Sequence, residues 1–202
     1  MSTEQIAQAV AALRAGLLVG LPTDTVYGLA ASAEVPGATD RLFAAKGRGG
    51  DVPVAVLCAD AAQALALADP DTLGDGVRRI AARLWPGPLT LVLRRRPGLA
   101  YALGEPEATI GVRCPAEPVV LAVAAAVGPL ATSSANRHGE PTPPTAAGVA
   151  EHFGTDVALV VDGGTRAAPP STVVDATGPD WKVLREGELN LADLTAAAGH
   201  AP

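Results

Sequence analysis

Two cations lie one residue apart in a glycine-rich stretch of this sequence, Lys46-Gly47-Arg48-Gly49-Gly50. Lysine acts as a point charge and arginine as a planar fork, so together they can wrap a polyphosphate. The same pair is also typical of a solvated helix C-terminus, where cations are favourable. Taken alone, the spacing favours the helix terminus over a phosphate site.

Hydroxyl and amide side chains gather at the end of a predicted strand, in Thr132-Ser133-Ser134-Ala135-Asn136. Short polar groups of this kind suit the oxygens of phosphates or carboxylates. A helix N-cap or an Asx turn would need only one or two of them. The excess therefore favours a binding site.

Other strand ends each carry one candidate residue for ligand binding. Arg113 ends the apolar stretch 109–113, where it can grip a carboxylate or phosphate or extend from the sheet edge, and both interpretations stay open. Ser171 lies at a strand start and Arg185 at a strand end. The segment 22–29, with the sequence PTDTVYGL, carries further hydroxyls, but alone it is typical of an ordinary turn.

Several common catalytic signatures are absent from the sequence. It contains no GxxxxGK[ST] phosphate loop, no GxGxxG opening a helix, no GxSxG elbow and no HExxH. Cys58 and Cys114 are far apart and the three histidines are scattered, so the sequence predicts no metal site and no disulfide framework. Nucleophilic Ser/His chemistry and zinc hydrolysis are therefore disfavoured.

The elements that position these residues alternate between helix and strand without a strict βαβ repeat, which predicts one α/β domain over residues 1–202 with a mixed sheet. A first helix carries Ile6, Val10 and Leu13 and stops at Gly16; a short helix carries Leu42 and Phe43 and ends in a loop starting at Lys46. Strands are expected at 17–21, 26–31, 53–58, 89–93, 109–113, 129–132, 157–161, 172–175 and 182–184, and further helices at 60–68, 75–84, 117–126, 144–152 and 191–198.

Composition limits the classes of protein and partner. Hydrophobic residues make up 49% and charged residues 18%, which favours a folded domain over disorder. The net charge of −6 excludes a globally basic nucleic-acid coat, although a local basic pocket is still possible. No apolar run approaches the roughly 20 residues of a membrane span, and residues 1–10 do not resemble a signal peptide. We therefore expect a soluble cytoplasmic protein.

Six motifs occur in order between about residue 8 and residue 189: PTDTVYGL, KGR, TIGVRCP, SSAN, PSTVVD and LREG. Together they resemble the YrdC-like threonylcarbamoyl-AMP synthase family, whose KxR…SxN signature matches Lys46-x-Arg48 and Ser134-x-Asn136. The resemblance implies an open α/β fold with a twisted mixed sheet around a positively charged cleft. It also implies that L-threonine, bicarbonate or CO2, and ATP are converted to L-threonylcarbamoyl-AMP and pyrophosphate.

The resemblance further implies site residues and partners. Magnesium accompanies ATP, with no metal site of the protein's own. Partner transferase proteins then modify tRNA, which they contact in place of this chain, and no membrane is involved. By matching position, threonine is bound by Thr25, Arg113, Thr132 and Ser171; ATP by Arg48, Thr109, Ser134, Thr142 and Arg185; and Lys46, Arg48, Ser134 and Asn136 form the catalytic signature.

Three positions depart from the family pattern. Gly49 replaces a common proline, and Val52 and Leu57 stand where some members place an asparagine that touches ATP and a histidine that touches threonine. These changes keep open a second interpretation, a paralogue that binds nucleotide or RNA without synthesis. A third, a carbamoyl-adenylate-forming domain of the hydrogenase-maturation type, usually lies within a longer chain with zinc-finger cysteines.

Overall fold

A mixed sheet of nine strands runs through the computed structural model, which describes residues 3–47, 49–50, 52–137 and 139–199. The strand order is β7-β1-β2-β6-β3-β5-β4-β8-β9, with parallel pairs β1–β7, β3–β5 and β4–β8 and antiparallel pairs elsewhere. The predicted α/β fold with a mixed sheet is confirmed. The strands are β1 (Val19–Leu21), β2 (Gly28–Ser32), β3 (Ala55–Leu57), β4 (Leu89–Arg94), β5 (Thr109–Arg113), β6 (Leu130–Ser134), β7 (Leu159–Val160), β8 (Thr172–Asp175) and β9 (Lys182–Arg185).

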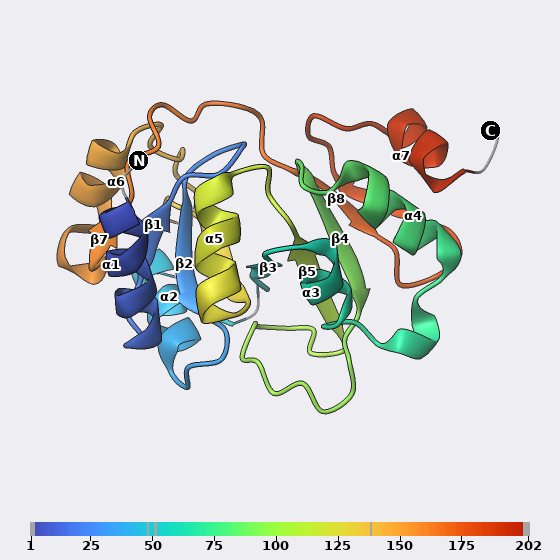
Figure 1. Cartoon of the computed structure of the whole chain (residues 1–202), viewed down its shortest axis with the longest axis horizontal. Coiled ribbons are helices and arrows are strands. Elements are labelled where there is room, and N and C mark those ends of the chain that lie inside the picture. Colours follow the sequence, from blue (N-terminus) through green and yellow to red (C-terminus); the bar gives the residue numbers. More distant parts are fainter. Residues whose placement is uncertain (1–2, 48, 51, 138, 200–202) are drawn as a thin grey trace.

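Helices flank the sheet, and their ends follow local backbone chemistry (Figure 1). α2 is followed by its C-cap Gly47, whose φ of 64° is the left-handed conformation that glycine adopts without a steric penalty. α5 begins with Pro118, because the first helical turn does not need that N–H as a donor. The α-helices are α1 (Thr3–Arg14), α2 (Ala38–Lys46), α3 (Ala61–Leu65), α4 (Asp75–Leu84), α5 (Pro118–Val127), α6 (Ala146–Phe153) and α7 (Leu191–Ala198).

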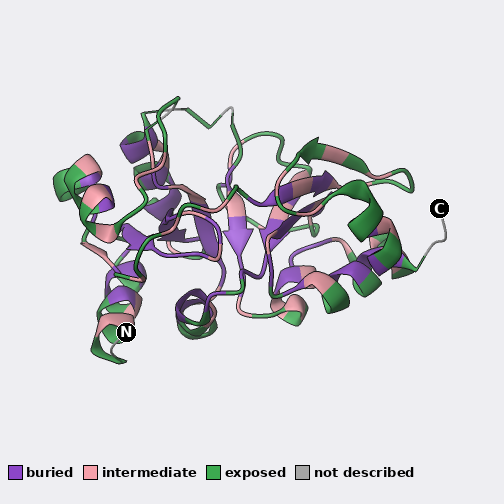
Figure 2. Cartoon of the chain, turned by 90° about the horizontal axis from the view of Figure 1, so that it is seen from above, coloured by how far each residue is buried: buried purple, intermediate pink, exposed green. Residues whose placement is uncertain are grey.

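Alternation along the strands divides the buried side chains into two hydrophobic clusters. In β3, Val56 belongs to the larger cluster and Leu57 to the smaller; in β6, Ala131 belongs to the larger and Leu130 to the smaller. Successive strand residues point to opposite faces, so the two clusters cover opposite faces of the sheet. The larger contains residues of α2, α3, α4, α6 and α7, and the smaller those of α1 and α5. Figure 2 shows the buried strands along the middle of the molecule.

The same alternation leaves polar residues on one face of β5. Ile110 and Val112 belong to the larger cluster, whereas Thr109, Gly111 and Arg113 alternate with them and line a cleft. The cleft therefore opens on the face opposite the larger cluster. The polar side chains of β5 on this face line the cleft, where they are available for binding.

A long segment, 161–171, crosses from β7 to β8 and joins the two ends of the sheet (Figure 1). The buried Tyr27 hydroxyl accepts a hydrogen bond from the Gly163 N–H at 3.0 Å and donates to the next residue's carbonyl at 2.9 Å. Arg166 donates to the buried Glu117 carboxylate, next to the start of α5, at 2.6 Å. These contacts define the path of the crossing segment after it leaves β7.

Most predicted ranges agree with the structure, and two differences have local causes. The helix predicted over 60–68 ends at Leu65, because the residues after it pair with the end of β4: the Arg96 N–H donates to the Leu67 carbonyl and the Asp69 N–H to the Arg94 carbonyl. Sheet pairing replaces the last helical turn there. The loop predicted to start at Lys46 begins one residue later, since Lys46 is the last residue of α2.

Gly187 lies against the start of β8, which provides a stability test of this part of the sheet. A Cβ atom at Gly187 would lie 2.3 Å from the Pro170 carbonyl oxygen and 2.5 Å from the Thr172 nitrogen. Both are backbone atoms, so Gly187→Ala must displace the strand, and we expect the free energy of unfolding to fall by at least about 2 kcal/mol in a denaturant titration. The matched control is Gly178→Ala, whose Cβ would meet nothing within 4 Å. Equal stability of the two variants would contradict this packing.

Candidate functional site

A cleft of about 410 Å³ lies over the middle of the sheet. The segment 23–28, the strands β3 to β6 and the chain around β8 and β9 line it. Residues far apart in the sequence thus come together, as the motifs predicted, although their binding roles stay predictions. The predicted site residues that line the cleft are Thr25, Thr109, Arg113, Thr132, Ser134, Ser171 and Arg185.

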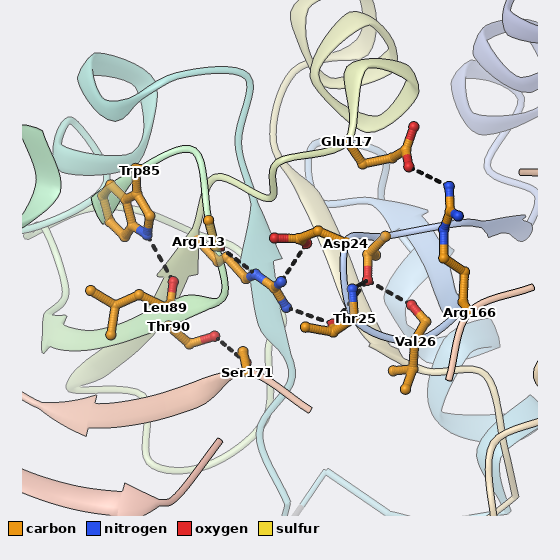
Figure 3. A network of polar contacts seen from close by, with 12 residues as sticks. Asp24, Thr25, Val26, Trp85, Leu89, Thr90, Arg113, Glu117, Arg166 and Ser171 are labelled. Carbon is orange, nitrogen blue, oxygen red and sulfur yellow. Dashed lines mark hydrogen bonds and ion pairs between the residues drawn. The ribbon is translucent and has the colours of Figure 1, made fainter. Parts of the chain in front are cut away.

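Arg113 is buried in this cleft and has three protein partners (Figure 3). Its Nε donates to the Gly87 carbonyl at 3.1 Å, Nη1 to Thr25 Oγ1 at 3.2 Å and Nη2 to Asp24 Oδ1 at 2.5 Å. A guanidinium carries five N–H donors, so two are left for a ligand. The three contacts fix the plane of the fork, and Asp24 compensates the buried charge.

The charges of the cleft favour anionic ligands. Burial lowers the pKa of Arg113, the Asp24 carboxylate acts in the opposite direction, and Arg185 lowers the Arg113 pKa further. Burial also lowers the pKa of Arg185. None of the described residues that line the cleft carries a carboxylate. Asp24 compensates Arg113 from outside that lining, so the cleft keeps an excess of positive charge.

Ser171 holds Arg185 at the other side of the cleft. Arg185 Nε donates to the Ser171 carbonyl at 3.0 Å, and Nη2 donates to Ser171 Oγ at 3.0 Å. Ser171 Oγ also lies 2.9 Å from Thr90 Oγ1 on β4, and Figure 3 shows the two side chains pointing toward one another. The sequence analysis missed Thr90, although a hydroxyl inside the apolar stretch 89–93 was a signal that could have identified it.

Lys46 is 2% exposed and belongs to a hydrogen-bond network beside the cleft. Its Nζ donates to the Ser134 carbonyl at 2.5 Å and to the Asn136 carbonyl, and lies 3.3 Å from Asn136 Oδ1. Thr142 Oγ1 donates to the same Oδ1 at 3.2 Å, and Asn136 Nδ2 donates to two carbonyls of the segment 137–140. Lys46, Asn136 and Thr142 therefore shape the chain that follows β6, and they are not among the described residues lining the cleft.

One predicted threonine ligand, Thr132, has a backbone partner, and one predicted ATP ligand, Arg48, cannot be placed. Thr132 Oγ1 donates to the Leu130 carbonyl at 3.1 Å. Gly28 pairs with Ser134 across the β2–β6 pair, and a Cβ atom at Gly28 would lie 2.8 Å from the methyl group of the diagonal neighbour Thr132. Arg48 lies outside the described residues, so its contact with ATP stays a prediction.

The segment 22–29 is more than the ordinary turn that its sequence alone suggested. Thr23 Oγ1 donates to the Val26 carbonyl at 2.6 Å and lies 3.0 Å from Thr25 Oγ1, which receives the Arg113 hydrogen bond. Asp24 holds the same guanidinium. The sequence contains no local signal for the role of Asp24, because its partner Arg113 lies 89 residues away along the chain.

Two of the departures from the family pattern line the cleft as apolar side chains. Leu57 is 4% exposed and belongs to the smaller hydrophobic cluster, whereas Val52 is 38% exposed at the surface. Neither offers a hydrogen bond to a ligand.

The cysteines and the acidic residues offer no alternative chemistry in the part of the chain that the structure describes. Cys58 and Cys114 are buried free thiols; burial raises the pKa of Cys114 to about 12 and raises that of Cys58 as well. A thiol that stays protonated is a poor nucleophile and a poor metal ligand. The described residues contain no cluster of three or more His, Cys, Asp or Glu side chains able to hold a metal. Among the described helices, none has the length and apolar character of a membrane span.

Comparison with known sequences matches almost the whole chain. The model of the Sua5/YciO/YrdC family, described as telomere recombination, matches residues 11–187. A Mycobacterium tuberculosis protein, provisionally named a threonylcarbamoyl-AMP synthase, is 39% identical over 197 residues, which are 96% of this chain and 89% of the relative. The threonylcarbamoyl-AMP synthase of Pyrococcus abyssi is 38% identical over 189 residues, 93% of this chain and 55% of that protein.

Solved structures have the same fold. The crystal structure of Pyrococcus abyssi Sua5 in complex with L-threonine superposes with a TM-score of 0.91 and 37% identity, covering 99% of this chain and 59% of that one. Escherichia coli YciO superposes with a TM-score of 0.84 and 26% identity, covering 96% of this chain and 94% of that one. This chain thus spans a little over half of the archaeal protein and nearly all of YciO.

The Lys46 network generates a prediction about stability. Lys46→Met keeps the apolar stem and removes the ammonium that bonds to the carbonyls of Ser134 and Asn136. Because a buried acceptor that loses its partner costs about 1–3 kcal/mol, we expect the free energy of unfolding to fall by about 2–4 kcal/mol. Chemical denaturation measures it, with Lys182→Met as the control, since Lys182 is exposed on β9. Wild-type stability of Lys46→Met would show that the network does not hold the segment.

Proposed function

We propose that this chain, which belongs to the Sua5/YciO/YrdC family, is a threonylcarbamoyl-AMP synthase. Its substrates are L-threonine, bicarbonate or CO2, and ATP, and its products are L-threonylcarbamoyl-AMP and pyrophosphate. The threonylcarbamoyl group then passes to an adenosine of tRNA. We assign that transfer to partner proteins, because a chain with a net charge of −6 and 3% aromatic residues has few surfaces for RNA.

The charge of the cleft is the observation that carries this proposal. Two arginines line it, hydroxyls from several strands surround them, and no described lining residue is acidic. Threonine presents a carboxylate, its carbamate adds a second negative charge, and ATP presents a triphosphate, so the reacting groups repel each other and need a cationic site to meet. A cleft of this charge suits the joining of two anions.

The contacts of each side chain suggest how the cleft divides between the substrates. We assign the threonine carboxylate to Arg113, whose two remaining N–H groups can form a fork, with Thr25, Thr132 and Ser171 around the amino acid. ATP takes Arg185, Ser134 and Thr109, together with Arg48. Lys46, Asn136 and Thr142 act by holding the chain after β6 in place, since their polar atoms are bonded to one another and to the backbone there.

The reaction needs positioning more than covalent catalysis. The deprotonated threonine amine attacks CO2 with release of one proton to solvent, or attacks the carbon of bicarbonate with loss of water, and forms a carbamate. A carbamate oxygen then attacks the α-phosphorus of ATP, and pyrophosphate leaves. No side-chain nucleophile is required, which agrees with the protonated state of the buried thiols. Arginines and hydroxyls that hold two anions in line can supply much of the rate.

Magnesium fits this site as a companion of ATP. The described lining residues provide no carboxylate to bind the cation, so the phosphate oxygens of ATP are its natural ligands. We therefore propose that Mg²⁺ enters and leaves with the nucleotide and that the arginines share the neutralisation of its phosphates. We place the enzyme in the cytoplasm, where buried free thiols such as Cys58 stay reduced.

Pyrophosphate release by the purified chain tests the proposal. We expect release only when L-threonine, bicarbonate and ATP are all present, and mass spectrometry should detect threonylcarbamoyl-AMP. A protein that binds ATP and threonine yet releases no threonine-dependent pyrophosphate would instead be the binding paralogue that the apolar Val52 and Leu57 allow. Release that needs ATP but not threonine would contradict the substrate assignment.

Arg113 generates a sharper prediction. In Arg113→Lys a single ammonium replaces a fork that bonds to Gly87, Thr25 and Asp24, so it cannot also present two donors to a carboxylate. Losing a charge-assisted contact costs about 1.5–3 kcal/mol, so we expect kcat/KM for threonine to fall about 10- to 150-fold. The KM for ATP should change less than about twofold if the arginine serves the amino acid alone.

The control for this variant is Arg78→Lys, at an exposed position of α4. Thermal unfolding of both variants separates a loss of fold from a loss of binding. A folded Arg113→Lys enzyme with wild-type threonine kinetics would refute the carboxylate assignment.

A further inference from the structure

Thr90 and Ser171 form a pair of hydroxyls in the floor of the cleft, and Thr90 belongs to none of the sequence motifs. Both residues are nearly buried, with exposures of 5% and 4%. Their oxygens lie 2.9 Å apart, and Ser171 Oγ also accepts the hydrogen bond from Arg185 Nη2 at 3.0 Å. The pair therefore has a fixed geometry before any ligand binds.

The Thr90–Ser171 pair can offer one hydroxyl proton to a ligand. The two hydroxyls carry two protons, and one of them lies between Thr90 Oγ1 and Ser171 Oγ, whichever oxygen donates. Arg185 can only donate, so it takes no proton from the pair. One hydroxyl proton is left, and both residues line the cleft. The pair is thus a preformed donor for one ligand oxygen.

The position of Thr90 relates this donor to the amino-acid site. On β4 and β5, Leu91 pairs with Val112, and one further step of the same antiparallel register places Thr90 opposite Arg113. Directly opposed residues of an antiparallel pair have Cβ atoms only about 5 Å apart. The Thr90 methyl faces Gly111, since it lies 3.6 Å from a Cβ built there, and the hydroxyl faces Ser171. An amino acid held by Arg113 therefore has its side chain within reach of the pair.

We propose that the Thr90–Ser171 pair recognises the side-chain hydroxyl of the amino-acid substrate, and that Thr90 determines this selectivity. The inference rests on the proposed function for the presence of an amino acid in the cleft. Threonine and serine supply an oxygen that accepts the spare proton. Valine, of nearly the same shape as threonine, places a methyl group there and leaves a buried donor unpaired, which a site of this kind penalises.

Calorimetric titration of L-threonine, L-serine and L-valine tests the inference without requiring turnover. Wild-type protein should bind threonine most tightly, then serine, and valine most weakly. Thr90→Val keeps the shape and the branched Cβ but leaves the Ser171 hydroxyl without the partner that fixes its direction. We therefore expect the threonine-to-valine affinity ratio to fall about five- to tenfold, which corresponds to the loss of one neutral hydrogen bond. Thr90→Ser restores the hydroxyl and should keep that ratio within about twofold of wild type.

The matched control is Thr195→Val on α7, outside the cleft, which should leave the ratio unchanged. Thermal unfolding confirms that each variant is folded. If Thr90→Val weakens the binding of all three amino acids equally, Thr90 supports the carboxylate or the fold. If it weakens the binding of none of them, Thr90 takes no part in recognition. Either result overturns the inference. Pyrophosphate release by wild-type protein reports separately on the proposed function: its absence together with selective threonine binding would overturn the synthase assignment and leave the recognition role standing.

Discussion

Arg113 carries a positive charge that is buried in the cleft, and its ion pair with Asp24 at 2.5 Å offsets the free-energy cost of that burial. Each ion moved out of water costs several kcal/mol unless a partner and further hydrogen bonds compensate it. Asp24 comes from the segment that joins β1 to β2, whereas Arg113 ends β5, so the pair connects two parts of the sheet. Removing either member would leave a buried charge and would also free the segment 22–29.

The charge that Arg185 contributes to the cleft depends on how Arg113 is compensated. Since Asp24 compensates Arg113, the excess charge of the cleft resides mainly on Arg185, which the Ser171 backbone and hydroxyl hold without a carboxylate. A ligand carboxylate at Arg113 makes that region net negative, and a phosphate near Arg185 then sees an uncompensated cation. Under the proposed function, this division of partners separates the carboxylate of threonine at Arg113 from the phosphates of ATP at Arg185.

The sequence predicted the strands and the gathering of polar residues at their ends, because alternation and glycine or proline stops are local signals. It left Arg113 open between a ligand site and a sheet edge, since the partner that decides the matter lies 89 residues away. Lys46 looked like a solvated helix end for the same reason: its acceptors lie on the chain after β6. Long-range pairing of charges and carbonyls carries no local signature, so these roles needed the fold.

The apolar side chain of Leu57 supports recognition of the ligand hydroxyl by Thr90 on β4 and Ser171 at the start of β8. At Leu57, where the family resemblance implies that some members carry a histidine contact to threonine, this chain offers only packing against the smaller cluster. A buried ligand hydroxyl still needs a partner. Of the hydroxyls assigned to the amino acid, Thr132 is bonded to its own strand and Thr25 already accepts from Arg113, whereas the Thr90–Ser171 pair has a proton to spare. Because Leu57 offers no hydrogen bond, selectivity for the ligand hydroxyl depends on the Thr90–Ser171 pair, which lines the same cleft.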